Sequence, residues 1–240
     1  MVEDKDVRFH LNLFQRWQLI SGESEVYVAS RQQRLIAALA LYGARNRRYI
    51  CGLLWPDSPE ARALESLRVT MHLISRQIPG LLVNGGPVLS LAPSLSVDLH
   101  NCLEQVRGCQ TSISYTPDDA CLSHLRHAEL LPGWYDDWVI LEQNRLRTFR
   151  LRALAGHAQR WLDREEPEKA AEAARSALEL EPLQEACVGL LMRAELELGN
   201  RVGAVHTFES FKASLATELG VAPSAYLYQL VAGIRGPVRS

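Results

Sequence analysis

The stretch from Asn46 to Leu91 constrains the fold more than any other part of the chain, because four local signals follow one another there. A short apolar helix is predicted from Asn46 to Trp55, and it stops at Pro56, whose ring removes a backbone donor. A longer segment with apolar residues on one side follows. An Asn-Gly turn between two short apolar runs then predicts a hairpin. Helix, turn, helix and hairpin in this order predict a winged helix-turn-helix.

The longer helix is predicted from Glu60 to Ile78, with Pro79 and Gly80 ending it. Apolar residues recur along it at spacings of three and four, which is typical of a helix with one buried side. The residues of this predicted buried stripe are Leu64, Leu67, Met71, Ile74 and Ile78.

The residues before this stretch predict a small sheet and a first helix. Apolar and polar residues alternate from Val7 to Phe14, and strands are also expected at Trp17–Ile20 and Val26–Ala29. Together they predict a three-stranded antiparallel sheet. Ser30 is the expected N-cap of the first helix, which ends before Gly43.

Beyond residue 99 the pattern is helical almost throughout. Alanine-rich contact positions and short turns between helices of similar length resemble tetratricopeptide repeats, in a degenerate form. The predicted helices are 99–112, 117–130, 138–164, 167–180, 183–198, 202–219 and 223–234. The predicted fold class is therefore an α+β winged helix-turn-helix domain over residues 1–96, followed by an all-α tetratricopeptide-like helical domain over 97–240.

Positive charge is concentrated in the first of these domains. The whole chain has a formal net charge of -2, yet Val26–Leu82 contains eight arginines and three acidic residues. Such a local excess favours a surface that faces phosphates, although a solvated charged face is the alternative for any single arginine.

Cysteine usage and the N-terminus bear on the compartment. The five cysteines include no CxxC pair, which indicates reduced thiols rather than a disulfide framework. The N-terminus is polar and acidic, and no run approaches the length of a membrane span. We expect a cytoplasmic protein that does not enter a membrane.

The side of the long helix opposite the stripe is the candidate surface for a DNA major groove. Arginine and histidine there can bind guanine edges or phosphates, Ser66 and Thr70 can donate to phosphates, and Val69 or Leu73 can contact a thymine methyl group. The alternative is an ordinary amphipathic helix with a mixed polar face.

Further candidates flank this helix. Arginines at the start of the second helix lie near backbone N–H groups that already favour a phosphate, and Arg31 begins the first helix. The wing contributes its predicted turn. The candidate DNA-binding residues are Arg31, Arg45, Arg47, Arg48, Arg62, Ser66, Arg68, Val69, Thr70, His72, Leu73, Arg76, Asn84 and Gly85.

Two other clusters are weighed and set aside. Cys121, His124 and His127 recur three apart and could converge on a metal ion, but no fourth ligand is indicated and the helix needs its own packing face. Asp136 and Asp137 are adjacent, so Asp136 is interpreted as a helix cap rather than as half of an acid–base pair. No phosphate loop or catalytic motif is found. We therefore predict no enzyme activity, no metal and no cofactor.

Several motifs together resemble the Streptomyces antibiotic regulatory protein (SARP) family. In the first domain the resemblance rests on Leu54–Ala61, on Ser66 to Arg68 and His72, and on Val97–Leu99 at the junction. In the second domain, Leu131–Trp138, Arg145–Arg147 and Glu218–Ser224 resemble that family's bacterial transcriptional activator domain.

The resemblance implies a function and partners. Such proteins bind direct repeats in double-stranded DNA upstream of promoters, often as head-to-tail dimers, and recruit RNA polymerase. The family's groove helix carries several arginines, whereas Leu67–Arg76 keeps arginine only at positions 68 and 76. Affinity for phosphate is therefore expected to be lower, or specificity to depend on apolar and hydroxyl contacts.

Two functional hypotheses result. The first is a cytoplasmic transcriptional regulator, an activator with a DNA-binding winged helix and a helical domain for dimerisation and contact with RNA polymerase. The second is an adaptor whose repeats bind a protein or small effector, and whose winged domain has lost most of its DNA affinity. The apolar residues Val69 and Leu73 keep this second hypothesis open.

Overall fold

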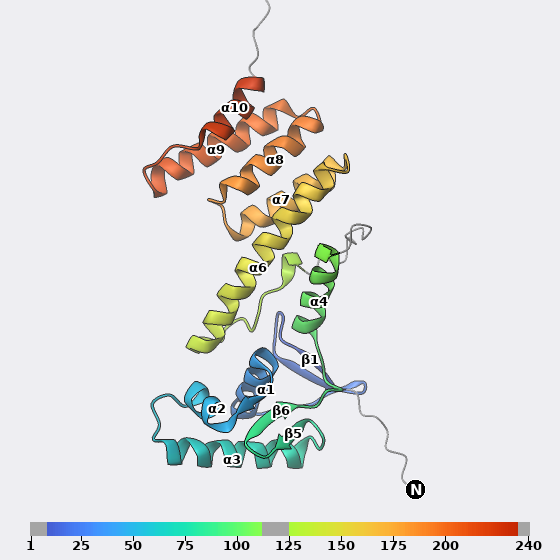
Figure 1. Cartoon of the computed structure of the whole chain (residues 1–240), viewed down its shortest axis with the longest axis vertical. Helices are drawn as coiled ribbons and strands as arrows, with labels where there is room; N and C mark the ends of the chain where they lie inside the picture. Colours follow the sequence, from blue (N-terminus) through green and yellow to red (C-terminus); the bar gives the residue numbers. More distant parts are fainter. Residues whose placement is uncertain (1–8, 112–124, 235–240) are drawn as a thin grey trace, which may run out of the picture. The chain divides into compact units, whose positions relative to one another are not determined.

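The computed structural model describes residues 9–111 and 125–234 (Figure 1). The chain divides into two compact units. The first comprises Met1–Thr111 and His127–Asn144, and the second comprises Ser112–Arg126 and Arg145–Ser240. The domain boundary between residues 96 and 97 stays a prediction.

The first unit opens with a sheet of four strands in the order β3-β2-β1-β7. The strands are β1 (Phe9–Asn12), β2 (Gln18–Ser21), β3 (Ser24–Glu25) and β7 (Ser96–Val97). β1 pairs antiparallel with β2 and parallel with β7. Phe9, Leu11 and Leu13 are buried, as the alternation along the first strand predicts.

The prediction of a three-stranded antiparallel sheet was wrong in two respects. It lacked β7, a two-residue parallel strand contributed by a distant part of the chain. It also placed the third strand at Val26–Ala29, whereas the turn at Gly22 brings Ser24 and Glu25 back onto β2. Past Val26 the chain leaves the sheet to enter the first helix, and the Gln33 side-chain amide donates to the Val28 carbonyl at 2.8 Å.

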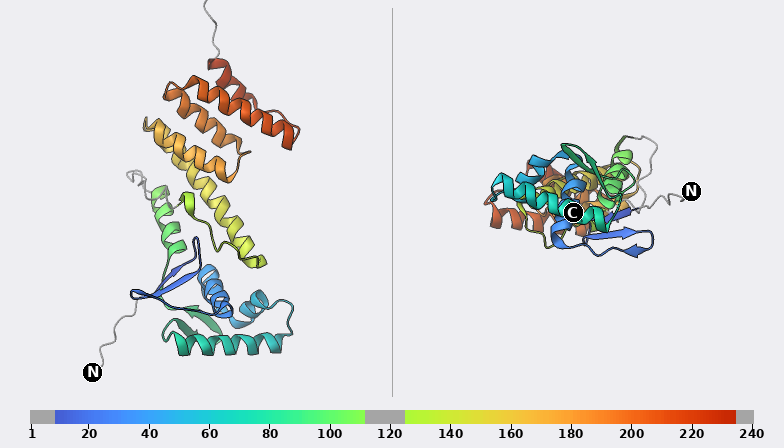
Figure 2. Two further views of the ribbon diagram at one scale, coloured as in Figure 1. Left: turned by 180° about the vertical axis from the view of Figure 1, so that it is seen from behind. Right: turned by 90° about the horizontal axis from the view of Figure 1, so that it is seen from below.

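Three helices and a second sheet complete the winged domain (Figures 1 and 2). The helices are α1 (Ser30–Tyr42), α2 (Arg47–Leu54) and α3 (Glu60–Gln77). The second sheet has the order β4-β6-β5, from β4 (Arg45–Asn46), β5 (Leu82–Gly85) and β6 (Val88–Leu91). Both α1 and α2 pack against α3, and the hairpin of β5 and β6 contacts α3 as well. The predicted winged helix-turn-helix is confirmed.

The ends of α1 and α2 follow local rules with one correction. The predicted cap Ser30 is the first residue of α1, and Ala29 is the N-cap instead. The Gln32 side chain accepts from the Ala29 N–H at 3.1 Å. Gly43 follows the last turn of α1 with a φ of 72°, which glycine adopts without strain. Asn46 caps α2 as predicted, because its side-chain oxygen accepts from the Arg48 N–H at 2.9 Å.

A single carboxylate joins the end of β1 to the start of α4 (Asp98–Thr111). Asp98 accepts from the N–H groups of Leu13 at 2.9 Å and 3.0 Å, Phe14 at 2.9 Å and Leu99 at 2.7 Å. Hydrogen bonds to an ionised acceptor are stronger than neutral ones. Asp98 therefore connects residues that lie 85 positions apart in the sequence.

The segment around Leu131 returns to the first unit. Phe14 and Leu130 form an isolated β-bridge, and the Leu131 N–H donates to the Leu13 carbonyl at 2.8 Å. This corrects the helix predicted over 117–130, of which residues 112–124 lie outside the described part. Within the described part only residues 125–127 are helical, because residues 129–131 pair with the chain after β1 instead.

The second unit consists of helices. α6 (Asp137–Leu162) begins in the first unit and ends in the second. It is followed by α7 (Pro167–Leu180), α8 (Glu185–Glu197), α9 (Arg201–Glu218) and α10 (Ala225–Ile234). α7 packs against α8, α8 against α9, and α9 against α10. The predicted tetratricopeptide-like helical domain is confirmed.

Small residues allow these helices to pack closely. Ala170, Ala174 and Ala177 are fully buried on α7, as their spacing predicts. At Gly189 of α8, an added Cβ would lie 2.9 Å from the ring of Tyr226, the second residue of α10. Any residue other than glycine at this position would therefore require the Tyr226 ring to move. The core between α8, α9 and α10 contains Val188, Met192, Ala204, Phe208, Phe211, Leu215, Leu227 and Val231.

We expect the substitution Asp98→Asn to lower the free energy of unfolding by about 1–3 kcal/mol at neutral pH. The amide has one acceptor oxygen where the carboxylate has two, and its NH₂ group would face N–H donors. Urea denaturation of the variant and the parent measures the difference. Glu104→Gln, on the exposed side of the same helix, is the control and should change stability little. Equal stability of both variants would contradict the role assigned to Asp98.

The buried His157 should make the free energy of unfolding of the second unit depend on pH. Its side chain is 2% exposed and stacks near Trp161, with ring centroids 5.6 Å apart. Burial, and secondarily Arg160, lowers its pKa from 6.5 to about 4. Between these values the unfolded chain binds a proton that the folded chain does not, so stability present above pH 6.5 is lost as the pH falls.

Replacing His157 by phenylalanine should remove this dependence. Between pH 7.5 and pH 5, the parent should lose about 1–2 kcal/mol more unfolding free energy than His157→Phe. Urea denaturation at both pH values measures this, and His206→Phe, at an exposed position of α9, is the matched control. A parallel pH response of parent and His157→Phe would contradict the prediction.

Candidate nucleic-acid interface

The buried side of α3 differs from the predicted stripe. Leu67, Ile74 and Ile78 are buried as expected, but Leu64 and Met71 are only partly buried. Ala63 and Thr70 take their places in the core. The prediction weighed only large apolar residues, whereas the close packing of α1 and α2 on α3 favours small ones at these positions.

Thr70 is therefore removed from the candidate DNA-binding residues. Its side chain is 0% exposed, and its hydroxyl donates to the Ser66 carbonyl at 2.7 Å. A hydroxyl in this position is not available to a phosphate. Ser66 itself is half-buried one turn earlier.

The solvent-facing side of α3 carries most of the other candidates. Val69 and Leu73 are 43% and 46% exposed. Arg68 is exposed and forms an ion pair with Glu65 on the same helix. Within residues 9–111 and 125–234, no ion pair involves Arg62 or Arg76, so both guanidinium groups are available to a ligand. The exposed candidates on this helix are Arg62, Arg68, Val69, His72, Leu73 and Arg76.

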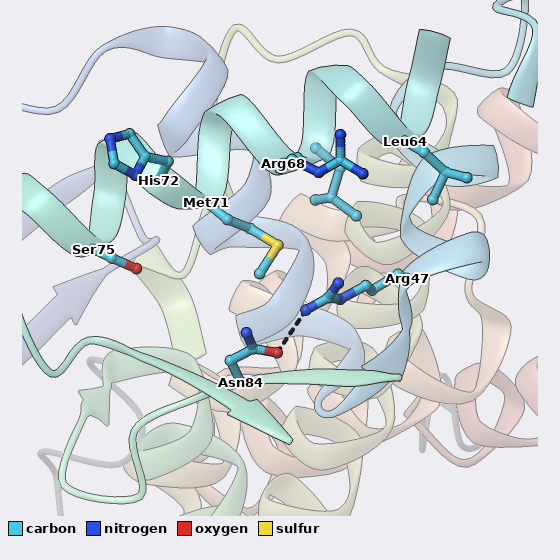
Figure 3. A pocket seen from close by; sticks show the side chains of 8 residues that line it. Arg47, Leu64, Arg68, Met71, His72, Ser75 and Asn84 are labelled. Carbon is cyan, nitrogen blue, oxygen red and sulfur yellow. Dashed lines mark hydrogen bonds between the residues drawn. The ribbon is translucent and has the colours of Figure 1, made fainter. Parts of the chain in front are cut away.

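A hollow of about 400 Å³ lies between α3, the start of α2 and the wing (Figure 3). Arg47 crosses it from the first turn of α2 and donates to the side-chain oxygen of Asn84 on β5 at 2.6 Å. This bond ties the wing to α2. The lining residues are Arg47, Leu64, Leu67, Arg68, Met71, His72, Ser75 and Asn84.

Besides the core residue Leu67, three of these lining residues were missed by sequence reasoning. Leu64 and Met71 were assigned to the core stripe, and Ser75 was not singled out. A second series with spacings of three and four runs along the same helix through Ala63, Leu67, Thr70 and Ile74. Had this series been taken as the buried one, Leu64 and Met71 would have been predicted outside the core.

The turn of the wing, predicted over Asn84 to Pro87, is shorter in the structure. β5 continues through Asn84 and Gly85, and the turn residues are Gly86 and Pro87. Gly86 has a φ of 74°, which fits the first central position of a type II′ turn, where glycine is preferred. Asn84 is thus placed on the strand, facing Arg47, while Gly85 is exposed at the strand end and does not line the hollow.

The remaining arginines are spread around the start of α2 and α1. Arg45 lies over the Tyr49 ring at 5.6 Å, and Arg48 forms an ion pair with Glu60 at 3.0 Å, which links α2 to the first turn of α3. Arg31 is exposed on the first turn of α1 and does not line the hollow. The structure therefore brings Arg47 and Arg68 together with His72 and Asn84, but not Arg31.

The structure also bears on the cysteine–histidine cluster and on the adjacent aspartates Asp136 and Asp137. Cys121 and His124 lie outside the described residues, and among the described residues no group of three potential ligands is arranged for a metal ion. Asp136 precedes α6 as expected of a cap, but its carboxylate accepts from Arg34 of α1.

Burial raises the pKa of the Cys51 thiol, with a further contribution from the Glu60 carboxylate, so this thiol stays protonated.

Comparison with known proteins identifies the helical region. The sequence model of the family described as "Bacterial transcriptional activator domain" matches residues 97–235. The chain belongs to this family. The resemblance to SARP regulators, whose bacterial transcriptional activator domain the motifs of the second domain indicated, is thereby confirmed.

A solved structure supports the fold of the whole chain. Mycobacterium tuberculosis EmbR, in complex with a low affinity phosphopeptide, is similar with a TM-score of 0.75 and 17% sequence identity. The match covers 97% of this chain and 66% of that chain, so this chain spans just under two thirds of it. The search of curated proteins gives no significant match. No described helix is long and apolar enough to cross a membrane.

Proposed function

We propose that this protein activates transcription by binding double-stranded DNA through its winged domain. The observation that carries the proposal is the solvent-facing side of α3, where Arg62, Arg68, His72 and Arg76 accompany two exposed apolar side chains. An α-helix with basic and apolar side chains on its free side matches the dimensions and chemistry of a major groove.

The hollow beside α3 suits the DNA backbone. Arg47 and Arg68 place two guanidinium groups around it, and His72, Ser75 and Asn84 add further polar atoms. Contacts of this kind fix the position of a protein on the duplex without reading its sequence. Because Asn84 belongs to the wing and Arg47 to α2, a phosphate bound here would order both elements against α3.

The helical region would serve the downstream steps. We propose that it contacts RNA polymerase and supports a homodimer on repeated DNA sites, as its membership of a transcriptional activator family suggests. Run-off transcription from a selected site, with purified bacterial RNA polymerase, tests the first part. Stimulation by the full chain and none by DNA-binding variants is the expected result, and unchanged transcription with bound activator would contradict it.

DNA binding should weaken steeply with salt and depend on the free arginines of α3. Sites are first selected from random duplexes with the purified protein, and affinity is then measured between about 50 and about 200 mM salt. Arg62→Ala and Arg76→Ala should each weaken binding and reduce the slope of log affinity against log salt by about 0.9, the value for one phosphate contact.

Arg16→Ala is the matched control, because Arg16 is exposed in the loop between β1 and β2 and pairs with Glu25. It should leave the slope unchanged. Absence of binding to any duplex at low salt would overturn the proposal and favour the adaptor hypothesis. An equal loss of slope in all three variants would contradict the assignment of α3 as the contact surface.

A further inference from the structure

The centre of the exposed face of α3 is apolar, while its two ends are basic. Successive helical residues are separated by about 100°, so Arg62, Val69, Leu73 and Arg76 project within an arc of about 60°. Val69 and Leu73 are exposed at 43% and 46%. The order along this line is arginine, two branched apolar side chains, arginine.

This order fits a helix inserted in a major groove. Arg62 and Arg76 are about 21 Å apart along the helix axis, which exceeds the groove width of about 12 Å. The two ends of the helix therefore approach the phosphate backbones, where arginine is suited, and its centre approaches the base edges. Val69 and Leu73 occupy that centre.

An apolar side chain has one partner among the base edges of the major groove. The C5-methyl group of thymine is the apolar group there, and the other edges present hydrogen-bond donors and acceptors. A donor or acceptor that loses water against valine or leucine without a new partner is penalised. The two side chains thus favour thymine and disfavour an unpartnered polar edge.

The geometry points to Val69 and Leu73 as residues that recognise the methyl groups of two thymines. This inference rests on the proposed DNA binding and specifies its sequence preference. The two side chains lie about 6 Å apart along the helix, and base pairs are spaced at about 3.4 Å. The two thymines should accordingly lie about two base-pair steps apart.

Replacing thymine by deoxyuridine tests the inference, because it removes only the methyl group and leaves the protein unchanged. In a selected site, each thymine is replaced in turn and affinity is measured at fixed salt. We expect about a fourfold loss at each of two positions about two steps apart, the effect of one buried methyl group, and little change elsewhere.

Variants of the protein assign each methyl group to a side chain. Val69→Ala should bind more weakly and become insensitive to deoxyuridine at one position while keeping the loss at the other, and Leu73→Ala should show the reverse pattern. Arg76→Ala is the matched control from the same face, and it should bind more weakly yet keep both losses.

The outcomes separate this inference from the proposed function. Salt-dependent binding with equal affinity for thymine and deoxyuridine at every position would overturn the inference and leave DNA binding intact. Losses that persist unchanged in both Val69→Ala and Leu73→Ala would also overturn it. If no duplex binds even at low salt, the proposed function fails, and this inference fails with it.

Discussion

The rotation of α3 about its own axis is the constraint on which the candidate interface depends. Burial of Ala63, Leu67, Thr70 and Ile74 determines which side chains reach solvent. A rotation of the helix by one residue, about 100°, would exchange hollow-lining residues for groove-facing ones. The small side chains of Ala63 and Thr70 stabilise the observed rotation, because α1 and α2 pack against this side of α3. The residues that pack in the core thus also determine which residues of α3 are exposed to a ligand.

The motifs that carried the family resemblance are largely structural. Asp98 binds backbone N–H groups after β1, and Asp136 accepts from Arg34 of α1, whose guanidinium also donates to the Leu54 carbonyl at 3.3 Å. Arg147 of α6 forms an ion pair with Glu181 at 3.2 Å. Such contacts hold the fold and involve none of the exposed residues of α3, so a chain can keep every one of them while α3 changes. Family membership and DNA sequence preference are therefore separate properties here.

Sequence reasoning succeeded where a local rule acts alone and failed where tertiary packing decides. The caps at Gly43 and Asn46 and the order of helices and hairpin follow from single residues and short spacings. The short strand β7 and the pairing of residues 129–131 with the chain after β1 depend on partners far away in the sequence, which no local pattern reveals. The burial of Thr70 and the partial exposure of Met71 belong to this second class, because helix periodicity places a stripe only to within one residue.

An arginine-poor reading helix alters the balance between affinity and specificity. Phosphate contacts supply nearly all of the affinity for non-specific DNA and the counterion release, whereas apolar contacts to bases release no counterions and add affinity only at matching sequences. Replacing phosphate contacts by apolar base contacts lowers non-specific affinity more than specific affinity. The ratio of specific to non-specific affinity therefore rises, although the affinity of one protomer falls. Two protomers on adjacent repeats would recover that affinity, because the second binding event occurs at a high effective concentration. For the proposed DNA binding, the composition of α3 is thus better suited to repeated sites occupied by two copies than to a single site.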